Sequence, residues 1–290
     1  MVYKSQGEWG WRMAIEIFCG GTAGSTYILS VLPYLFFGSR IFLSGVLASL
    51  VLVLISVFVL MTDLTSVWRA PRAFLNIQSP ISVGAISLSL FIILSIATVA
   101  MVYIGLLPGV LYLVGWLGIL VSLFTIIYPG VLMGLMRAFP FWSGSGSPLL
   151  LLSAALVSGG AAVTLVGGLS RVNFNLGRLT LWLLVIHGSF LFIYMMMGAQ
   201  GSKAAQISVQ RLIKGNLSSL FMLGVIAIGL VVHLVLYIVN IILSSATMLQ
   251  VGSGLILIGG ILLRYGLIAG GVRVPLLRED SISATYWLYH

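Results

Sequence analysis

Residues 61–84 read MTDLTSVWRAPRAFLNIQSPISVG and lie between two long apolar runs. The stretch contains an acid, a tryptophan, two arginines and two prolines, whereas the chain on either side is mostly hydrocarbon side chains and glycine. Charges and broken backbone are costly in lipid, because no water is present there to satisfy them. We therefore expect a polar connection between two membrane-spanning helices, on a water-accessible or protein-covered face, that forms one wall of the functional site.

The composition of the whole chain is that of a polytopic membrane protein. Of its 290 residues, 60% are hydrophobic and 7% are charged, and the mean hydropathy is +1.20, whereas about a quarter of the residues in a globular domain are charged. The apolar runs approach or exceed the roughly 20 residues that a spanning helix needs, and they lack the alternation of barrel strands. The N-terminal residues lack the features of a cleaved signal, so we expect the first apolar run to be a retained helix.

Windows of about 20 apolar residues predict an all-α membrane fold with eight transmembrane helices. The expected helices span residues 11–37, 40–63, 81–105, 109–137, 148–170, 178–199, 217–245 and 248–272. Residues 273–290 are expected to form a tail, and no loop is long enough for a soluble domain, so residues 1–290 make a single integral membrane domain. An even number of helices puts both termini on the same side of the membrane.

Basic residues are distributed unequally between the two sides of this arrangement. The side with the termini holds ten of them, namely Lys4, Arg12, Arg69, Arg72, Arg137, Lys203, Arg211, Lys214, Arg273 and Arg278. The opposite side holds three, Arg40, Arg171 and Arg178. Because Lys and Arg resist translocation, we expect the termini to be cytoplasmic. Alternatively, part of this basic face docks a partner subunit. We attribute the formal charge of +9 to orientation and lipid head groups, not to nucleic acid.

The cysteine content limits the metal chemistry of the chain. Cys19 is the only cysteine, and it lies inside the first apolar run. Disulfides, Cys-ligated zinc and iron–sulfur clusters all need several ligands, so we expect the chain to form no metal site. Electrons for any redox reaction must then come from a partner subunit.

Four polar residues on four expected helices fall at a similar depth below the side with the termini. At a rise of about 1.5 Å per residue, Glu16, Asp63, Tyr128 and Arg264 share one band. An ionisable residue inside the membrane is a functional candidate, because it is costly there unless it is paired or hydrated. Alternatively, Glu16 or Asp63 pairs with Arg264 only to staple the bundle, and Tyr128 is a packing aromatic whose hydroxyl caps a carbonyl freed by Pro129.

Two histidines, His187 and His233, lie in the sixth and seventh expected helices. Axial ligation of haem needs two histidines at matching depth, and a second haem has no ligand pair available. We expect no haem. The roles that remain for these residues are a hydrogen-bonded core histidine or one step in a proton path.

Two further patterns bear on packing. Residues 201–216 predict an amphipathic turn or two at the membrane interface, with Ile207 and Leu212 inward and with Lys203, Arg211 and Lys214 outward. Small residues recur at the spacing that lets helix backbones approach closely. These are Gly20 with Gly24, Gly130 with Gly134, and the cluster at 159–162.

Taken in order, these pieces resemble the NrfD/PsrC family, the membrane subunits of polysulfide-reductase-like molybdoenzymes and related respiratory complexes. The matching pieces are Trp9-Gly10-Trp11, Gly20-Gly21-Thr22-Ala23-Gly24, Asp63-Leu64, Pro71-Arg72, Ser79-Pro80 with Gly84, Tyr128-Pro129-Gly130, Pro140-Phe141-Trp142 with Pro148, Ser158-Gly159, and Leu263-Arg264-Tyr265. Each piece alone is common, so the specificity of the resemblance lies in their order and spacing over most of the chain.

The resemblance implies a subunit of two four-helix bundles, without haem, in a prokaryotic cytoplasmic membrane. It also implies a quinone site near the surface covered by a four-cluster ferredoxin-like iron–sulfur subunit. Beyond that subunit, a molybdopterin enzyme or a hydrogenase would be the catalytic partner. The terminal substrate resides in those partners and is not encoded in this chain.

The family's quinone pocket falls here on Glu16, Asp63 and Tyr128, with Arg264 expected to tune the carboxyl groups. The polysulfide reductase member places a histidine on the first helix where this chain has Glu16, so the head group would meet a carboxyl group that can also exchange protons. The residues expected to face the partner are Trp68, Arg69 and Arg72.

Three functions compete on these observations. The first is a quinone-reactive membrane anchor of a respiratory oxidoreductase. The second is a proton-translocating, energy-coupling subunit without quinone turnover, in which His187 and His233 continue a path from Glu16 and Asp63. The third is a purely structural anchor. A quinone site needs polarity at one end of the bundle only, whereas transport needs polar residues through the bilayer, and the first function fits this chain better.

Overall fold

The computed structural model describes residues 3–38, 40, 42–63, 79–105, 108–167, 176–243 and 245–274. Most of the connection quoted above therefore lies outside the described residues. The predictions for Trp68, Arg69 and Arg72 fall there, and so does the tail from residue 275.

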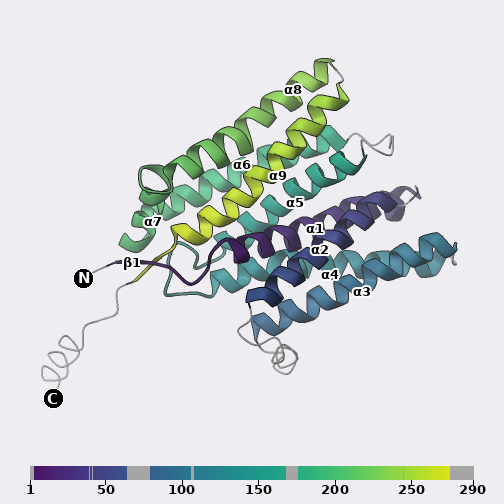
Figure 1. Ribbon diagram of the computed structural model, residues 1–290, viewed down its shortest axis with the longest axis horizontal. Helices are drawn as coiled ribbons and strands as arrows, with labels where there is room; N and C mark the ends of the chain where they lie inside the picture. Colours follow the sequence, from purple (N-terminus) through teal and green to yellow (C-terminus); the bar gives the residue numbers. More distant parts are fainter. Residues whose placement is uncertain are drawn as a thin grey trace, which may run out of the picture.

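The described part of the chain is almost entirely helical (Figure 1). Its elements are β1 (Lys4–Ser5), α1 (Trp11–Phe37), α2 (Leu43–Asp63), α3 (Pro80–Ile104), α4 (Pro108–Gly134), α5 (Gly146–Gly167), α6 (Leu176–Gln200), α7 (Lys203–Ile213), η2 (Leu220–Val232), α8 (His233–Leu243), α9 (Ala246–Gly270) and β2 (Val272–Arg273). Eight helices within this part are long and apolar enough to cross a membrane, with η2 and α8 together making the seventh. The eight predicted helices are therefore confirmed, with ends that shift by a few residues.

The helices differ in how much protein surrounds them. In α1, 89% of the most apolar window is buried, and in α5 72%, whereas the other six spans bury between 22% and 33%. Figure 1 shows α1 and α5 in the middle of the molecule with the other spans around them. The central α1 is also the least apolar span, with a hydropathy of 1.3. A helix that faces protein can carry Gly, Ser and Thr, whereas a helix that faces lipid needs hydrocarbon.

Hydroxyl groups connect α1 to its neighbours. Ser25 donates to the Ala155 carbonyl of α5 across 2.6 Å, and Ser49 of α2 donates to the Ala23 carbonyl of α1 across 2.9 Å. Lipid gives no hydrophobic drive for helix association, so such bonds and close packing hold the helices together.

Glycine allows the closest helix contacts, as the small-residue pattern predicts. A Cβ on Gly130 of α4 would lie 2.5 Å from the Cα of Pro148 in α5, and a Cβ on Gly24 of α1 would lie 3.0 Å from the Ser122 carbonyl oxygen of α4. At the contact between η2 and α9, which the sequence pattern did not single out, a Cβ on Gly229 would lie 2.8 Å from the Cα of Gly259. At these crossings one backbone packs against another, and neither can move aside cheaply.

We expect Gly259→Ala to lower the free energy of unfolding in detergent by about 1–3 kcal/mol, because the added methyl group overlaps the backbone at Gly229 and overpacks the interface. Gly254→Ala is the matched control, since it lies on the same helix and a Cβ there meets nothing within 4 Å. Reversible unfolding, followed by circular dichroism, measures both. Equal stability of the two variants would show that η2 and α9 do not pack this closely.

The two short strands bring together segments that are distant in sequence. Strands β1 and β2 pair antiparallel, with Lys4 opposite Arg273 and Ser5 opposite Val272. The connection between α4 and α5 joins them, because Trp142 stacks on Trp9 at 5.5 Å between ring centroids and donates its indole N–H to the Leu267 carbonyl. The first and last described segments therefore lie together at one end of the helices.

Residues 201–216 contain α7, which is more regular than the predicted turn or two. Leu212 is buried, and Lys203 and Lys214 are exposed, as predicted. Ile207 is half-buried, and so is Arg211, which was expected to point outward. Partial burial lowers the pKa of Arg211 from its ordinary value, and its Nε lies 3.5 Å from the Asn216 side-chain oxygen.

The seventh span begins as a π-helix. Residues Leu220–Val232 form η2, which passes into α8 at His233. The apolar pattern of 217–245 correctly predicted a helix there, but it does not distinguish a π-helix from an α-helix, because this segment is apolar on all sides.

Candidate functional site

Glu16 is the centre of the site that the sequence predicts. It lies in the second turn of α1, and its side chain is only 3% exposed. Its carboxylate oxygen Oε1 accepts a hydrogen bond from the Tyr128 hydroxyl at 2.5 Å. A carboxyl group is rarely buried without a partner. The structure thus brings together two predicted site residues that are 112 positions apart in the sequence.

Tyr128 is positioned by three helices. It precedes Pro129 within α4, and its ring packs against Gly84 of α3, where a Cβ would lie 2.5 Å from the ring atom Cε2. The hydroxyl then reaches Glu16 on α1, so it does not cap a carbonyl freed by Pro129. Glycine at position 84 leaves the space that this ring needs.

The second half of α2 runs beside the first turns of α1. Ser56 of α2 donates to the backbone carbonyl of Glu16 at 3.0 Å, and Arg12 reaches the Thr62 carbonyl at 3.4 Å. Residue Asp63 follows Thr62 as the last residue of α2. Its backbone therefore lies near the start of α1, but the position of its side chain is outside what the structure describes.

Arg264 lies apart from this pair. The side chain is 1% exposed, donates Nη1–H to the Gly260 carbonyl at 3.0 Å, and lies over the Phe18 ring at 5.2 Å from the centroid. Among the described side chains, no carboxylate oxygen lies within 4.0 Å of its guanidinium. The alternative in which Glu16 and Arg264 form an ion pair is therefore wrong.

The reason is rotation about the axis of α1. Glu16 and Phe18 are two residues apart, which corresponds to about 200° around a helix. Glu16 consequently faces Tyr128 of α4, while Phe18 faces Arg264 of α9. Residues that lie at a similar depth can therefore point to opposite faces of one helix.

The two histidines each use one ring nitrogen within the protein. His187 places Nδ1 at 2.9 Å from the Ser153 hydroxyl, and His233 places Nδ1 at 3.2 Å from the Ile228 carbonyl. Both side chains are buried. Within the described ranges, no group of three or more His, Cys, Asp or Glu could hold a metal ion.

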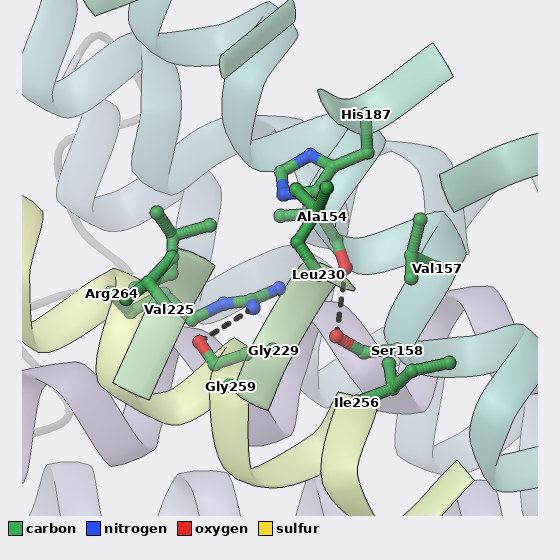
Figure 2. Close-up of a pocket in the computed structure, with 12 residues that line it drawn as sticks. Ala154, Val157, Ser158, His187, Val225, Gly229, Leu230, Ile256, Gly259 and Arg264 are labelled. Atoms are coloured by element: carbon green, nitrogen blue, oxygen red, sulfur yellow. Dashed lines mark hydrogen bonds between the residues drawn. The ribbon is translucent and has the colours of Figure 1, made fainter. Parts of the chain in front are cut away.

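A second polar centre surrounds Arg264 and was not predicted as a site of its own. It is a cavity of about 20 Å³. Figure 2 shows the Arg264 guanidinium and the His187 ring among the residues that line it. The remaining walls are Ala154, Val157, Ser158, Val225, Gly229, Leu230, Ile256, Gly259, Gly260 and Leu263. The sequence offers one indication of this cavity. Glycines 229, 259 and 260 lie at similar positions in the last two apolar runs, where two helices can pack closely.

The model of the family described as "Polysulphide reductase, NrfD" matches residues 3–275. The chain belongs to the NrfD family.

Membership of this family, together with eight apolar helices, makes the chain an integral membrane protein. Its family also assigns it to the membrane subunits of respiratory oxidoreductases, whose members pair with an iron–sulfur subunit and a catalytic subunit. The search of curated proteins found no match for this chain.

Proposed function

We propose that this NrfD-family subunit binds quinone or quinol at the Glu16–Tyr128 pair and exchanges electrons with a partner iron–sulfur subunit. The observation that carries the proposal is the 2.5 Å hydrogen bond between the Tyr128 hydroxyl and the buried Glu16 carboxylate. A hydroxyl donor and a carboxyl group that can release or take up a proton are what a quinone head group requires at its two oxygens. The oxidoreductase family of the chain supports the same reading.

In this proposal the two side chains have distinct roles. A quinol supplies two electrons and two protons on oxidation, and a quinone takes up the same on reduction. On quinone binding, the Tyr128 hydroxyl exchanges its hydrogen bond to Glu16 for one to a head-group oxygen and holds the ring in place. Glu16 accepts the two protons of the quinol one after the other during oxidation, releasing the first before it takes up the second, or returns two in turn during reduction. Because the carboxyl group is shielded from bulk water, each proton leaves through polar groups at the near end of the helices.

The electrons leave through a partner in this proposal. A four-cluster ferredoxin-like subunit would receive them and pass them to a molybdopterin enzyme or a hydrogenase. We place this partner over the end of the bundle that holds β1, β2 and the α4–α5 connection, because Glu16 is only five residues from the start of α1 at that end. The exposed Trp11, stacked on Tyr265 at 3.8 Å between ring centroids, belongs to the same end.

The proposed membrane arrangement is two four-helix bundles, with both termini on the cytoplasmic side of a prokaryotic cytoplasmic membrane. Pairing of β1 with β2 supports the common side, because it joins the two ends of the helical region. The excess of ten basic residues over three supports the cytoplasmic orientation. The hydrogen bond from Ser25 to Ala155 would then be one of the contacts that join the bundles.

We expect Gly84→Ala to reduce quinol-linked electron transfer by about tenfold or more, although position 84 supplies no functional group. The added methyl group would displace the Tyr128 ring and so misplace its hydroxyl. Steady-state assays of the intact complex with a soluble quinol measure this. Gly188→Ala on α6 is the control, because a Cβ there meets only ordinary contacts from 3.5 Å. Equal activity of the two variants would place the reacting quinol away from Tyr128.

A further inference from the structure

The cavity beside Arg264 lies among α5, α6, η2 and α9, away from the Glu16–Tyr128 pair. Arg264 is the only residue lining the cavity that carries a formal charge. Figure 2 shows this group projecting from α9 between Val225 and Leu230 of η2 and Gly259. The site is thus a cation in a mostly hydrocarbon enclosure within the membrane-spanning region.

The charge on Arg264 has no acidic counterpart among the described side chains. The whole chain has five acidic residues, Glu8, Glu16, Asp63, Glu279 and Asp280. Of these, Glu16 is bonded to Tyr128, and no carboxylate oxygen among the described side chains approaches Arg264 within 4.0 Å. An arginine remains protonated in proteins, and a buried charge without a counter-charge is strongly unfavourable. Within the part of the chain that the structure describes, the fold therefore has a buried positive charge to neutralise.

Arg264 also has hydrogen-bonding capacity to spare. Nη1 donates to the Gly260 carbonyl, but Nε has no hydrogen-bond partner among the described residues. The guanidinium carries five N–H groups in a planar fork suited to anions. The Phe18 ring covers one face of the guanidinium plane and leaves the N–H groups at the edge of that plane available to a ligand.

His187 can supply a further donor from the opposite wall. The Ser153 hydroxyl lies 2.9 Å from both the Leu150 carbonyl and His187 Nδ1. The Ser153 hydroxyl donates its one hydrogen to the Leu150 carbonyl, and it donates to Nδ1 instead only in the tautomer whose ring hydrogen is on Nε2. Nε2 makes no hydrogen bond to a described residue, so in that tautomer its N–H is available to an occupant of the cavity that His187 lines.

From these observations we propose that the cavity binds one small monovalent anion of about the size of chloride. The guanidinium of Arg264 neutralises its charge, and His187 donates to it through Nε2. The hydrocarbon walls favour a weakly hydrated anion with a single charge, since no second cation is present in the lining to balance another.

The size of the cavity decides against larger ligands. A volume of about 20 Å³ is enough for a water molecule or an ion slightly larger than one. Ligand pockets for molecules of quinone size are roughly 300–1,000 Å³. A water molecule fits by volume but leaves the charge of Arg264 uncompensated. An anion satisfies both the volume and the charge.

A bound anion would stabilise the packing of η2 against α5 and α9, because residues from all three helices line the cavity. It goes beyond the proposed quinone function and does not depend on it. The two sites use different residues, so a failure at one leaves the other open to test.

Chloride is the probe that tests the proposal, on the purified full-length subunit with any partners that copurify. At constant ionic strength, replacing gluconate by chloride is expected to raise the Tm of the wild type by about 2 °C or more, because a ligand that binds only the folded state stabilises it. Arg264→Gln removes the cation and should abolish this shift. Arg137→Gln, at an exposed arginine, is the matched control and should retain it.

Bromide provides a second measurement that does not depend on how the variants fold. Crystals of the wild type grown in bromide should show an anomalous peak within hydrogen-bond distance of Arg264. A water molecule at that position without anomalous signal, or equal Tm values in chloride and gluconate, would overturn the proposal. A chloride shift that persists in Arg264→Gln would also overturn it, by placing the anion elsewhere.

Discussion

Replacing Glu16 by glutamine is expected to lower quinol-linked electron transfer by about 100-fold or more, with the protein still folded. Glutamine has nearly the same shape, and its side-chain oxygen can still accept the hydrogen bond from Tyr128. It cannot take up or release a proton, and positioned acid–base groups typically contribute factors of about 10² to 10⁴. The rate of quinol oxidation by the intact complex, measured at saturating quinol, tests this expectation.

The control for Glu16→Gln is the same substitution at Glu8, which is exposed near the N-terminus. It removes an identical side chain at the end over which we place the partner, and it should lower turnover far less than Glu16→Gln does, because exposed charges contribute little. Wild-type turnover in Glu16→Gln would exclude the proposed site. Loss of proton translocation with normal quinol oxidation would favour the energy-coupling alternative.

Replacing Tyr128 by phenylalanine is expected to reduce turnover by about 100-fold and also to destabilise the subunit. The phenyl ring keeps the contact with Gly84 but cannot donate to Glu16 or to a head-group oxygen. Loss of one such preorganised donor typically costs about 10²–10³ in rate. The Glu16 carboxyl group would also lose its partner in a buried position, which costs about 1–3 kcal/mol of folding stability. Turnover and unfolding are both measured.

Tyr27→Phe separates these two effects. Tyr27 is fully buried, whereas Tyr128 is half-buried, and the Tyr27 hydroxyl shares a 2.7 Å hydrogen bond with Thr98. Removing that hydroxyl should cost stability without a comparable loss of turnover. If Tyr27→Phe lowers turnover as much as Tyr128→Phe, then general destabilisation and not loss of a quinone contact explains the result.

The double variant Glu16→Gln with Tyr128→Phe tests whether the pair acts as a unit. Residues that cooperate in one step show strongly non-additive losses. We therefore expect the turnover of the double variant to be close to that of the less active single variant. The combined loss should be much smaller than the product of the two separate losses. A fully multiplicative loss would indicate that the two groups act on different steps.

Several parts of the fold follow from sequence because the membrane sets them. The thickness of the hydrocarbon layer fixes the length of a spanning helix, so the run at 11–37 was predicted with the bounds that α1 has. Glycines 24 and 130 predicted close backbone contacts, since only glycine permits them.

The partners of the polar side chains did not follow from sequence. Glu16 and Arg264 were expected within one band, and the attraction of opposite charges suggested an ion pair. The structure instead bonds Glu16 to Tyr128 and leaves Arg264 over Phe18. Which residues meet depends on the rotation of each helix about its axis, and that rotation is set by the packing of all neighbouring helices at once.

From the sequence alone one obtains the membrane class, the eight spans, the family and the polar residues that are candidates for function. Each of these depends on local chain chemistry, namely the transfer of hydrocarbon into lipid and the spacing of residues along one helix. The tertiary structure alone decided that Glu16 faces Tyr128, that Gly84 makes room for that tyrosine, and that Arg264 borders a separate cavity. These are contacts between helices, and their geometry arises only when side chains from distant segments pack together in three dimensions.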